Sequence, residues 1–375
     1  MSTDARFDVE VAVIGAGVVG SAVALALARR GVSVALLEAE SEPGLCASGT
    51  NSGILHTGFD SHMGELETKL ILRAATLRDD VIDALGIPIL RCGAELAVAD
   101  GSVAQEIVDG ARANGVEALR RADGVIEIPQ EAVTDPVAYT LKLAAAAERH
   151  GAQLRTRFRV VGVEVGGGDL VLRSDGGAVR CRLAVNCAGL WADAIAALAG
   201  DDSFSIYPRK GEFIVFDPPE PLNRILLPVP TKRTKGVLVF PTIDGKVIAG
   251  PTAVDLEDKD DWSVRPEARD EILPKACVIY PALADASPIA AYAGLRPAGR
   301  GVNYLIGVST ACPALVNVAA IRSTGLTASL GIASYVCDLV ASQGVLMGAE
   351  EPLSPGAPVE VAEPWWRRTA AYRGL

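Results

Sequence analysis

The chain has 375 residues, of which 50% are hydrophobic, so it can form sizeable cores, and its length predicts two lobes. Its 46 acidic residues outnumber the 35 basic ones and give a formal net charge of −11. This balance argues against a nucleic acid partner, and an anionic substrate would have to meet a local cluster of Arg and Lys side chains.

The first eight residues are polar and acidic and lack the basic and apolar regions of a secretion signal. No apolar run reaches the length that spans a bilayer, so no transmembrane segment is expected. The seven cysteines are scattered and show no C-x-x-C spacing. We therefore expect a cytoplasmic protein with reduced thiols and without a metal or iron–sulfur site.

A glycine-rich turn lies within residues 11–20, which read VAVIGAGVVG. In such a motif Gly15 permits a tight turn, Gly17 lets the backbone approach a pyrophosphate, and Gly20 lets a helix pack closely on a strand. The helix expected over residues 21–30 then directs its N-terminus at the phosphates. The pattern predicts the phosphate-binding turn of a dinucleotide site.

A second apolar strand, residues 34–37, ends at Glu38, which lies 18 residues after Gly20. A carboxylate at this place accepts hydrogen bonds from an adenosine ribose and disfavours a 2′-phosphate. Together with the glycine turn, Glu38 predicts an adenine dinucleotide without telling which one.

Small and turn-forming residues crowd positions 41–53, directly after Glu38. The segment could merely connect two elements. Its backbone amides and hydroxyls could equally wrap a diphosphate or a ring system, and its place next to the nucleotide favours this interpretation. His56 follows the loop immediately.

Helices and strands then alternate along the chain. Residues 69–85 have a helical pattern, and the region from about 88 to 136 changes character. Asp135 and Pro136 begin another helix, because proline suits the first turn. The remaining elements expected before residue 185 are strands at 95–99, 125–128, 160–165, 169–173 and 178–184 and helices at 103–114 and 137–150.

A buried strand ends in Asn186-Cys-Ala-Gly-Leu-Trp191 and opens a new helix, where a parallel sheet would present its backbone to a cofactor. From Phe204 to about Tyr292 the chain is β-rich, Pro-rich and charged, and its short alternating runs suit an antiparallel sheet. Strands at 304–308 and 315–319 and a long apolar helix entered at Gly325 follow. The nucleotide lobe is therefore expected to be discontinuous and twice interrupted by a substrate lobe.

Motifs along nearly the whole chain resemble those of the FAD-dependent oxidoreductases of the D-amino-acid-oxidase-like superfamily. They are the glycine turn with Glu38, Asn51-Ser-Gly-Ile-Leu-His56, Asn186 to Asp193, Lys210-Gly-Glu-Phe213, Gly294-Leu-Arg-Pro297 and the helix entry at Gly325. Residues 230–242, 244–255 and 316–329 resemble the flavin-linked glycerol-3-phosphate dehydrogenases most, and the L-2-hydroxyglutarate oxidases come next. Many such dehydrogenases have a cysteine-rich C-terminal domain that the printed sequence does not contain, so substrate and electron acceptor stay open.

The resemblance implies an α/β fold, in which a Rossmann-like, three-layer FAD-binding domain with a parallel sheet carries an inserted substrate domain with a mixed or antiparallel sheet. The implied FAD-binding domain comprises residues 1–86, 137–200 and 293–345, the substrate domain residues 87–136 and 201–292, and a C-terminal tail residues 346–375.

The expected contacts with FAD come from the glycine turn, the loop before His56, the end of the buried strand and the last helix entry. That entry offers backbone amides for the flavin N1–C2=O edge, although it could also be an ordinary capped helix start. The candidate residues are Gly15, Gly17, Val18, Val19, Gly20, Glu38, Ala47, Ser48, Asn51, Ser52, Gly53, Val160, Ala188, Gly189, Trp191, Arg296, Gly325, Leu326, Thr327 and Ala328.

His56 is the candidate catalytic base, because an imidazole exchanges protons near neutral pH and the chain has only three histidines. It could equally pack against the flavin without taking a proton. Arg296, in an expected turn from Gly294 to Pro297, and Arg322, before the last helix, are the candidate anion anchors, since a guanidinium grips carboxylate or phosphate with two hydrogen bonds. Lys210 and Lys232 are weaker candidates, and each of these cations could instead form a surface ion pair.

The resemblance implies FAD-dependent oxidation of a small anionic 2-hydroxy compound or polyol phosphate, with quinone or oxygen as electron acceptor. The alternatives are oxidation of an amino or N-methyl acid, a flavin-binding protein without catalysis, and a nicotinamide-dependent dehydrogenase. The aromatic and basic residues Trp365, Trp366, Arg367, Arg368 and Tyr372 suggest peripheral contact with the inner face of a membrane, or an ordinary tail.

Overall fold

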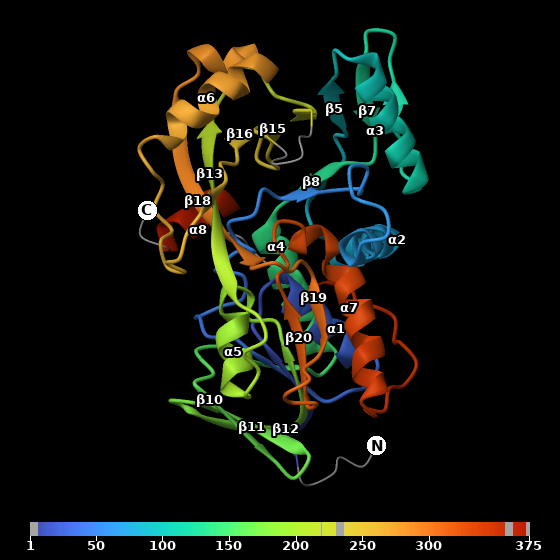
Figure 1. The fold of residues 1–375 in the computed structure, drawn as a ribbon, viewed down its shortest axis with the longest axis vertical. Coiled ribbons are helices and arrows are strands. Elements are labelled where there is room, and N and C mark those ends of the chain that lie inside the picture. Colours follow the sequence, from blue (N-terminus) through green and yellow to red (C-terminus); the bar gives the residue numbers. More distant parts are fainter. Residues whose placement is uncertain (1–6, 219, 230–235, 357–362, 373–375) are drawn as a thin grey trace.

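The computed structural model describes residues 7–218, 220–229, 236–356 and 363–372. Two lobes are stacked along the long axis of the molecule, each built on its own large sheet (Figure 1). We call them the nucleotide lobe, which is the lower one in Figure 1, and the substrate lobe. A small sheet of three short strands, β3 (Ile54–Leu55), β4 (Ile89–Leu90) and β8 (Ala132–Thr134), comes from the connecting segments.

The nucleotide lobe contains an eight-stranded mixed sheet. Its centre is parallel, in the spatial order β9-β2-β1-β12-β20, and β1, β2 and β20 are almost wholly buried, as in other covered parallel sheets. These five strands are β9 (Gln153–Arg155), β2 (Val34–Leu37), β1 (Val9–Ile14), β12 (Gly177–Asn186) and β20 (Leu315–Ala319). Antiparallel strands β10 (Gly162–Gly166) and β11 (Asp169–Ser174) extend one side through β12, and β19 (Leu305–Val308) pairs with β20.

Four long helices cover this sheet: α1 (Val18–Ala28), α2 (Leu66–Leu85), α4 (Pro136–Arg149) and α7 (Gly325–Ser342). Helix α1 packs against both α4 and α7, and α7 packs against α2. A Cβ on Gly331 of α7 would lie 2.0 Å from the backbone oxygen of Leu70, so glycine is what allows α2 and α7 to approach. Helix α7 is long and apolar enough to cross a membrane by length and composition, yet it is mostly buried within this lobe.

The substrate lobe contains a nine-stranded sheet. Its strands are β5 (Ala94–Ala97), β6 (Leu119–Arg120), β7 (Val125–Ile128), β13 (Ile206–Phe216), β14 (Ile225–Leu227), β15 (Leu238–Pro241), β16 (Val247–Gly250), β17 (Val254–Asp255) and β18 (Pro288–Gly299). The long antiparallel pair of β13 and β18 rises from the nucleotide lobe into the substrate lobe (Figure 1). The helical segments α3 (Gly101–Ala113), α6 (Ala268–Ile279) and η2 (Pro281–Asp285) complete the lobe.

The expected turn from Gly294 to Pro297 is wrong, because these residues lie inside strand β18. Pro297 faces Pro208 across the ladder with β13. Two residues without an N–H group fit a non-hydrogen-bonded pair, so neither proline removes a bond from the sheet. The expected domain boundary at residues 292 and 293 also falls inside β18, which belongs to the sheet of the substrate lobe as far as Gly299.

The tryptophans of the C-terminal tail, which suggested either a membrane contact or an ordinary tail, lie in the interior of the described structure. Trp365 and Trp366 lie in helix α8 (Trp365–Tyr372) and are buried, with 1% and 2% of their surface exposed. Trp365 packs edge-on against Tyr292 of β18, at 5.3 Å between ring centroids. Helix α8 is therefore part of the core of the substrate lobe.

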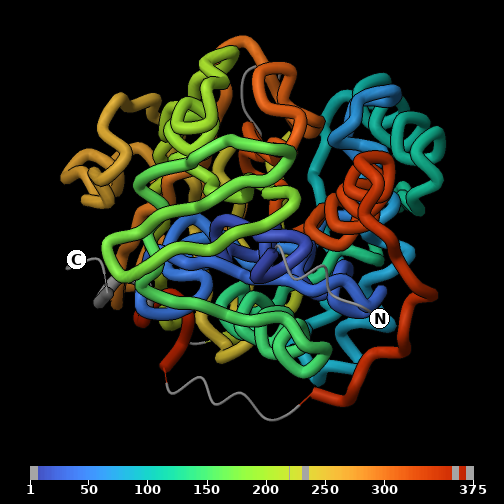
Figure 2. Tube along the Cα trace, turned by 90° about the horizontal axis from the view of Figure 1, so that it is seen from below, coloured from blue at the N-terminus to red at the C-terminus, as the bar shows by residue number. Residues whose placement is uncertain are grey.

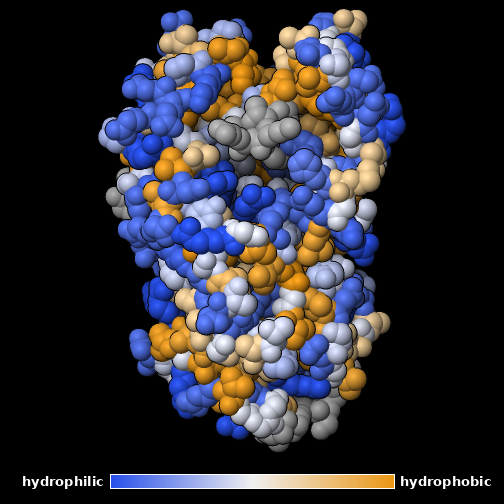
Figure 3. Space-filling view, in the orientation of Figure 1, coloured by the Kyte–Doolittle hydropathy of each residue, from blue (hydrophilic) through white to orange (hydrophobic). Residues whose placement is uncertain are grey.

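The surface is otherwise that of a charged protein. Seen from below, the strands β10, β11 and β12 run side by side across the underside of the nucleotide lobe (Figure 2). The face in Figure 3 carries mostly hydrophilic side chains, with apolar ones in small groups. The seven cysteines are free thiols, and four of them are buried.

Candidate active site

A cavity of about 340 Å³ lies in the nucleotide lobe, where the carboxyl ends of β1 and β2 meet the N-termini of α1 and α7. Open α/β sheets bind ligands at this end of their strands. Many residues predicted to contact a dinucleotide line it: Gly15, Gly17, Val18, Val19, Glu38, Ala47, Ser48, Asn51, Val160, Ala188, Gly189, Trp191, Gly325 and Leu326, together with the predicted anchor Arg322.

The glycine turn has the geometry that its sequence indicates. Gly15 has a φ of +98°, and a Cβ there would lie 2.6 Å from the backbone oxygen of Cys187. A Cβ on Gly20 would lie 1.9 Å from the backbone oxygen of Gly15, so this glycine lets α1 pack on the turn and lies behind the cavity wall. Gly17 is the N-cap of α1, which starts at Val18, three residues earlier than predicted.

Both helix N-termini at the cavity are suited to an anion. The N-cap residue of α1, Gly17, has no side chain, and the side chain of Thr324, the N-cap of α7, forms no capping hydrogen bond. At α1 the hydroxyl of Ser48 accepts a hydrogen bond from the backbone N–H of Val18 (2.9 Å). The backbone amides and the dipole at a helix N-terminus attract negative charge, so a diphosphate fits α1 and an electron-rich ring edge fits α7.

Glu38 lies in the cavity wall and is 8% exposed. Its carboxylate accepts hydrogen bonds from the backbone N–H groups of Ala16 (2.7 Å) and Glu40 (2.9 Å), which ties the turn after β1 to the end of β2. Burial raises the pKa of Glu38 above its ordinary value, against the effect of these hydrogen bonds. The position is the one from which an acid reaches an adenosine ribose.

His56 lies beside the first turn of α7. Its backbone N–H donates to the hydroxyl of Thr327 (3.0 Å), and its backbone oxygen accepts from Arg78 of α2 (3.2 Å). Its Nδ1 lies 3.0 Å from Oε2 of Glu131, while the side chain remains 16% exposed. Nε2 forms no hydrogen bond with any residue in the described part of the chain. The imidazole is therefore held at one nitrogen and open at the other.

Glu131 is the functional candidate that the sequence analysis missed. It follows β7 in the turn before β8 and is fully buried. Its Oε1 accepts hydrogen bonds from the backbone N–H (2.6 Å) and the hydroxyl (2.9 Å) of Thr57. No motif surrounds Glu131, and it is separated from His56 by 75 positions, so only the fold brings the two together.

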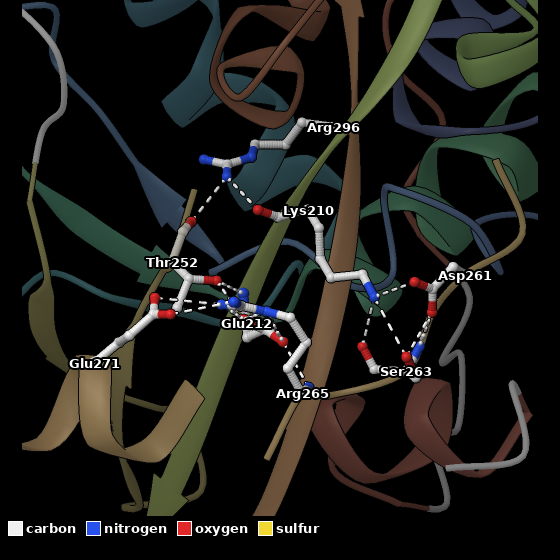
Figure 4. A network of polar contacts seen from close by, with 8 residues as sticks. All are labelled: Lys210, Glu212, Thr252, Asp261, Ser263, Arg265, Glu271 and Arg296. Carbon is white, nitrogen blue, oxygen red and sulfur yellow. Dashed lines mark hydrogen bonds and ion pairs between the residues drawn. The ribbon is translucent and has the colours of Figure 1, made fainter. Parts of the chain in front are cut away.

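Arg296 lies on β18 and is a partly buried cation held by backbone carbonyls. Its Nε donates to the oxygen of Arg209 (3.0 Å), and its Nη2 donates to those of Lys210 (3.0 Å) and Thr252 (2.9 Å) (Figure 4). Within the described residues, no carboxylate forms an ion pair with it and its Nη1 makes no hydrogen bond. Burial, together with the neighbouring Arg209, lowers the pKa of Arg296 to about 10. A partly buried cation that has no carboxylate partner can bind an anion through its remaining nitrogen.

Strand β18 brings Arg296 toward the loop of residues 41–53. A Cβ on Gly294 would lie 2.7 Å from the backbone oxygen of Thr50, so β18 lies directly on that loop, and Pro297 lines the cavity. Arg322 is different, because its Nε donates to Asn303 (3.0 Å) and its guanidinium lies 3.9 Å from a carboxylate oxygen of Glu67.

Lys210 does not line the cavity. Its side chain is fully buried, and its ammonium group lies 2.8 Å from a carboxylate oxygen of Asp261 and 2.9 Å from the backbone oxygen of Ser263. Two positions further along β13, Glu212 binds Arg265 and Thr252 in the same network (Figure 4). Lys232 lies outside the described residues.

Ser52, Gly53, Arg296, Thr327 and Ala328 do not line the cavity, although they were predicted to contact the cofactor, and neither does His56. Ser52 and Gly53 lead into β3, and Thr327 and Ala328 follow the first two residues of α7. Residues that the prediction omitted complete the wall: Ile14, Leu37, Ala39, Glu40, Cys46, Phe158, Arg159, Cys187, Leu190, Ala194, Ile195, Leu198, Pro297 and Val318 to Ile321.

Comparisons with known proteins give one family. Residues 10–339 match the family described as DAO, FAD dependent oxidoreductase. A glycerol 3-phosphate dehydrogenase from Caloramator mitchellensis is 27% identical over 92% of this chain and 76% of its own. A mitochondrial L-2-hydroxyglutarate dehydrogenase from Arabidopsis thaliana is 30% identical over 90% of this chain and 84% of its own. The solved structure of dithionite-reduced L-alpha-glycerophosphate oxidase from Mycoplasma pneumoniae, with FAD bound, shares the fold at a TM-score of 0.85, with 23% identity over 94% of this chain and 99% of that one.

Proposed function

Because the chain belongs to the FAD-dependent oxidoreductase (DAO) family, we propose that it oxidises the CH–OH group of a small anionic 2-hydroxy compound or polyol phosphate of the glycerol 3-phosphate type. FAD is the cofactor of this family. The observation that carries the proposal is the pairing of His56 with the buried carboxylate of Glu131 next to the N-terminus of α7. This arrangement leaves Nε2 of His56 open.

The residues around the cavity fit the parts of FAD. Glu38 would hold the adenosine ribose, the N-terminus of α1 with Ser48 the diphosphate, and the N-terminus of α7 the electron-rich edge of the flavin ring. When bound, FAD supplies the acceptor for the two electrons that leave the substrate carbon with a hydride.

His56 would act as the general base. Oxidation of an alcohol removes one hydride from carbon and one proton from oxygen, and leaves a carbonyl group. Nε2 of His56 would take the proton, and such a positioned base accelerates the reaction by about 10²- to 10⁴-fold.

Arg296 would bind the phosphate or carboxylate of the substrate. Three of its N–H bonds are directed at backbone carbonyls, which fixes the guanidinium plane, and Nη1 remains for the anion. An anion would also compensate a partly buried charge that no described carboxylate pairs with. Quinone or oxygen would then reoxidise the cofactor.

The test is anaerobic reduction of the holoenzyme by candidate substrates, measured as the loss of its flavin absorbance. The panel contains glycerol 3-phosphate, L-2-hydroxyglutarate, lactate and sarcosine. Rapid bleaching by glycerol 3-phosphate or L-2-hydroxyglutarate supports the proposal and separates its two branches. Bleaching by sarcosine alone would favour an amine oxidase, and a yellow protein that none of the four reduces would contradict the proposed function. Reoxidation by oxygen against a soluble quinone then identifies the acceptor.

A further inference from the structure

We propose that Glu131 is a positioning residue that fixes His56 in the tautomer with a proton on Nδ1, so that Nε2 is free to accept the proton of the substrate hydroxyl. This inference rests on the proposed function, and it assigns the role of Glu131 in the same site.

The hydrogen-bonding capacity of a carboxylate carries the argument. Oε1 of Glu131 accepts two hydrogen bonds from Thr57, and Oε2 faces Nδ1 of His56 at 3.0 Å. An ionised carboxylate only accepts hydrogen bonds, so Nδ1 must carry the hydrogen. In a neutral imidazole the other nitrogen, Nε2, then has the free lone pair.

The position of His56 is fixed at both ends. The side chains of Thr327 and Arg78 form hydrogen bonds with its backbone N–H and oxygen, so the backbone of His56 is held in place. Glu131 then fixes the rotation of the ring, because only one orientation places Nδ1 at 3.0 Å from Oε2. Nε2 forms no hydrogen bond with any described residue, and the side chain as a whole remains 16% exposed.

Within the described residues, no Lys or Arg side chain neutralises the carboxylate of Glu131, so its charge can act on His56. Glu131 is 0% exposed, and the described residues give it no ion pair with Lys or Arg. The nearby charged or titratable groups are Arg78 of α2, which binds the backbone oxygen of His56, and Cys92 before β5. Burial raises the pKa of the Cys92 thiol to about 11, to which Glu131 contributes, so this thiol is neutral at physiological pH. The carboxylate is therefore free to stabilise the imidazolium that forms when His56 takes up a proton.

The decisive variant is Glu131→Gln. The glutamine oxygen can still accept from Thr57, but its NH₂ group would donate to Nδ1 of His56 and force the hydrogen onto Nε2. We expect the rate of flavin reduction in the holoenzyme to fall by about 10²- to 10⁴-fold, while the substrate Kd changes little. In a His56→Ala background, Glu131→Gln should cause no further loss, because Glu131 acts through His56.

A spectroscopic measurement tests the tautomer directly, without dependence on turnover. The ¹⁵N signals of the three histidines, recorded in mildly alkaline buffer and assigned with His56→Ala, distinguish a protonated Nδ1 from a protonated Nε2. We expect protonated Nδ1 at His56 in the wild type and protonated Nε2 in Glu131→Gln. The control, Thr57→Val, keeps the carboxylate and should keep the wild-type tautomer.

Two results would overturn the inference. One is a wild-type His56 with its proton on Nε2, and the other is a folded Glu131→Gln protein that reduces its flavin as fast as the wild type. If none of the four compounds reduced the wild type, the proposed function would fail, whereas the ¹⁵N spectra would still decide the tautomer. The wild-type spectrum gives this answer even if the Glu131→Gln protein does not fold.

Discussion

Two regions of the molecule each contain a fully buried glutamate, and their partners differ. Glu131, beside the nucleotide lobe, meets the imidazole of His56 and the donors of Thr57. Glu212, on β13 of the substrate lobe, meets the guanidinium of Arg265, at 2.7 Å between Nη2 and Oε2, and the hydroxyl of Thr252, also at 2.7 Å.

The difference shows that the network of Glu212 is structural, whereas that of Glu131 can take part in catalysis. Arg265 keeps its charge at all physiological pH values, so the pair with Glu212 does not change during a reaction and acts as a clamp. Together with Lys210 and Asp261, it docks residues 251–265 on β13 and so fixes the Thr252 carbonyl that Arg296 uses. His56 can gain and lose a proton, so a buried carboxylate next to it can assist catalysis.

The largest effect is expected from His56→Asn, which keeps a polar side chain but removes the base. Flavin reduction by the best substrate should fall by about 10²- to 10⁴-fold, measured by anaerobic stopped flow. The melting temperature should stay close to that of the wild type. Equal rates in the two proteins would show that His56 only contacts the ligand. The pair of Glu131 and His56 would then have no catalytic role, and the two glutamates would not differ in this respect.

Glu212→Gln is the matched change in the other region. It removes a charge from a buried network and should lower the free energy of unfolding by about 1.5–3 kcal/mol, measured by urea denaturation of the holoenzyme. The ¹⁵N spectrum of His56 should not change. If the variant altered the histidine tautomer without lowering stability, the assignment of a purely structural role to Glu212 would be wrong.

The sequence predicted the nucleotide lobe well, because its signals are local. The glycine turn, Glu38 and the entry to α7 each act within a few residues, and members of each line the cavity: Gly15, Gly17, Glu38, Gly325 and Leu326. The substrate lobe was predicted less well. Glycine and proline at Gly294 and Pro297 suggested a turn, yet a second proline across the ladder, Pro208, makes a strand possible.

The candidate site shows the same limit. Lys210 stood out because it is basic in an acidic chain, but it lies in the clamp, two positions from Glu212. Glu131 is one acid among the 46 acidic residues of the chain, and nothing in its neighbours indicates His56. Pairings across 75 positions depend on the meeting of β3 with β8, which no local pattern specifies.

Arg296→Lys tests the receptor that the clamp supports. A lysine has no planar fork with which to reach three carbonyls and an anion at once, so the Kd for glycerol 3-phosphate should rise by about 10- to 100-fold. Flavin titration under anaerobic conditions with a slow substrate or an inhibitor measures it. The reduction rate at saturation should fall much less, and a loss confined to that rate would contradict the assignment of Arg296 to anion binding.

The smallest effect concerns acid. Burial works to raise the pKa of Glu212, but hydrogen bonds from Arg265 and Thr252 outweigh it and hold the pKa below its ordinary value, and Lys210 with Ser263 lowers the pKa of Asp261. Groups whose pKa is lower in the folded state stabilise it above their unfolded values of about 4, and this contribution is lost as the pH falls through the folded pKa. Melting temperatures recorded from pH 7 down to about pH 3 should therefore fall below about pH 4, and less steeply for Glu212→Gln. An equal slope in both proteins would exclude Glu212 as a source of the acid sensitivity.

The β13–β18 ladder also determines how the molecule responds to force. At one end Ile206 packs with Ala192, Ala319 and Ala320 of the nucleotide lobe, and at the other Phe213 stacks on Tyr292 at 4.9 Å within the core of the substrate lobe. The cores of both lobes thus pack against the same two strands, which connect the lobes rigidly. The lobes cannot swing apart like two bodies on a hinge without breaking the ladder. The two lobes should therefore unfold together, under force or on heating, rather than one after the other.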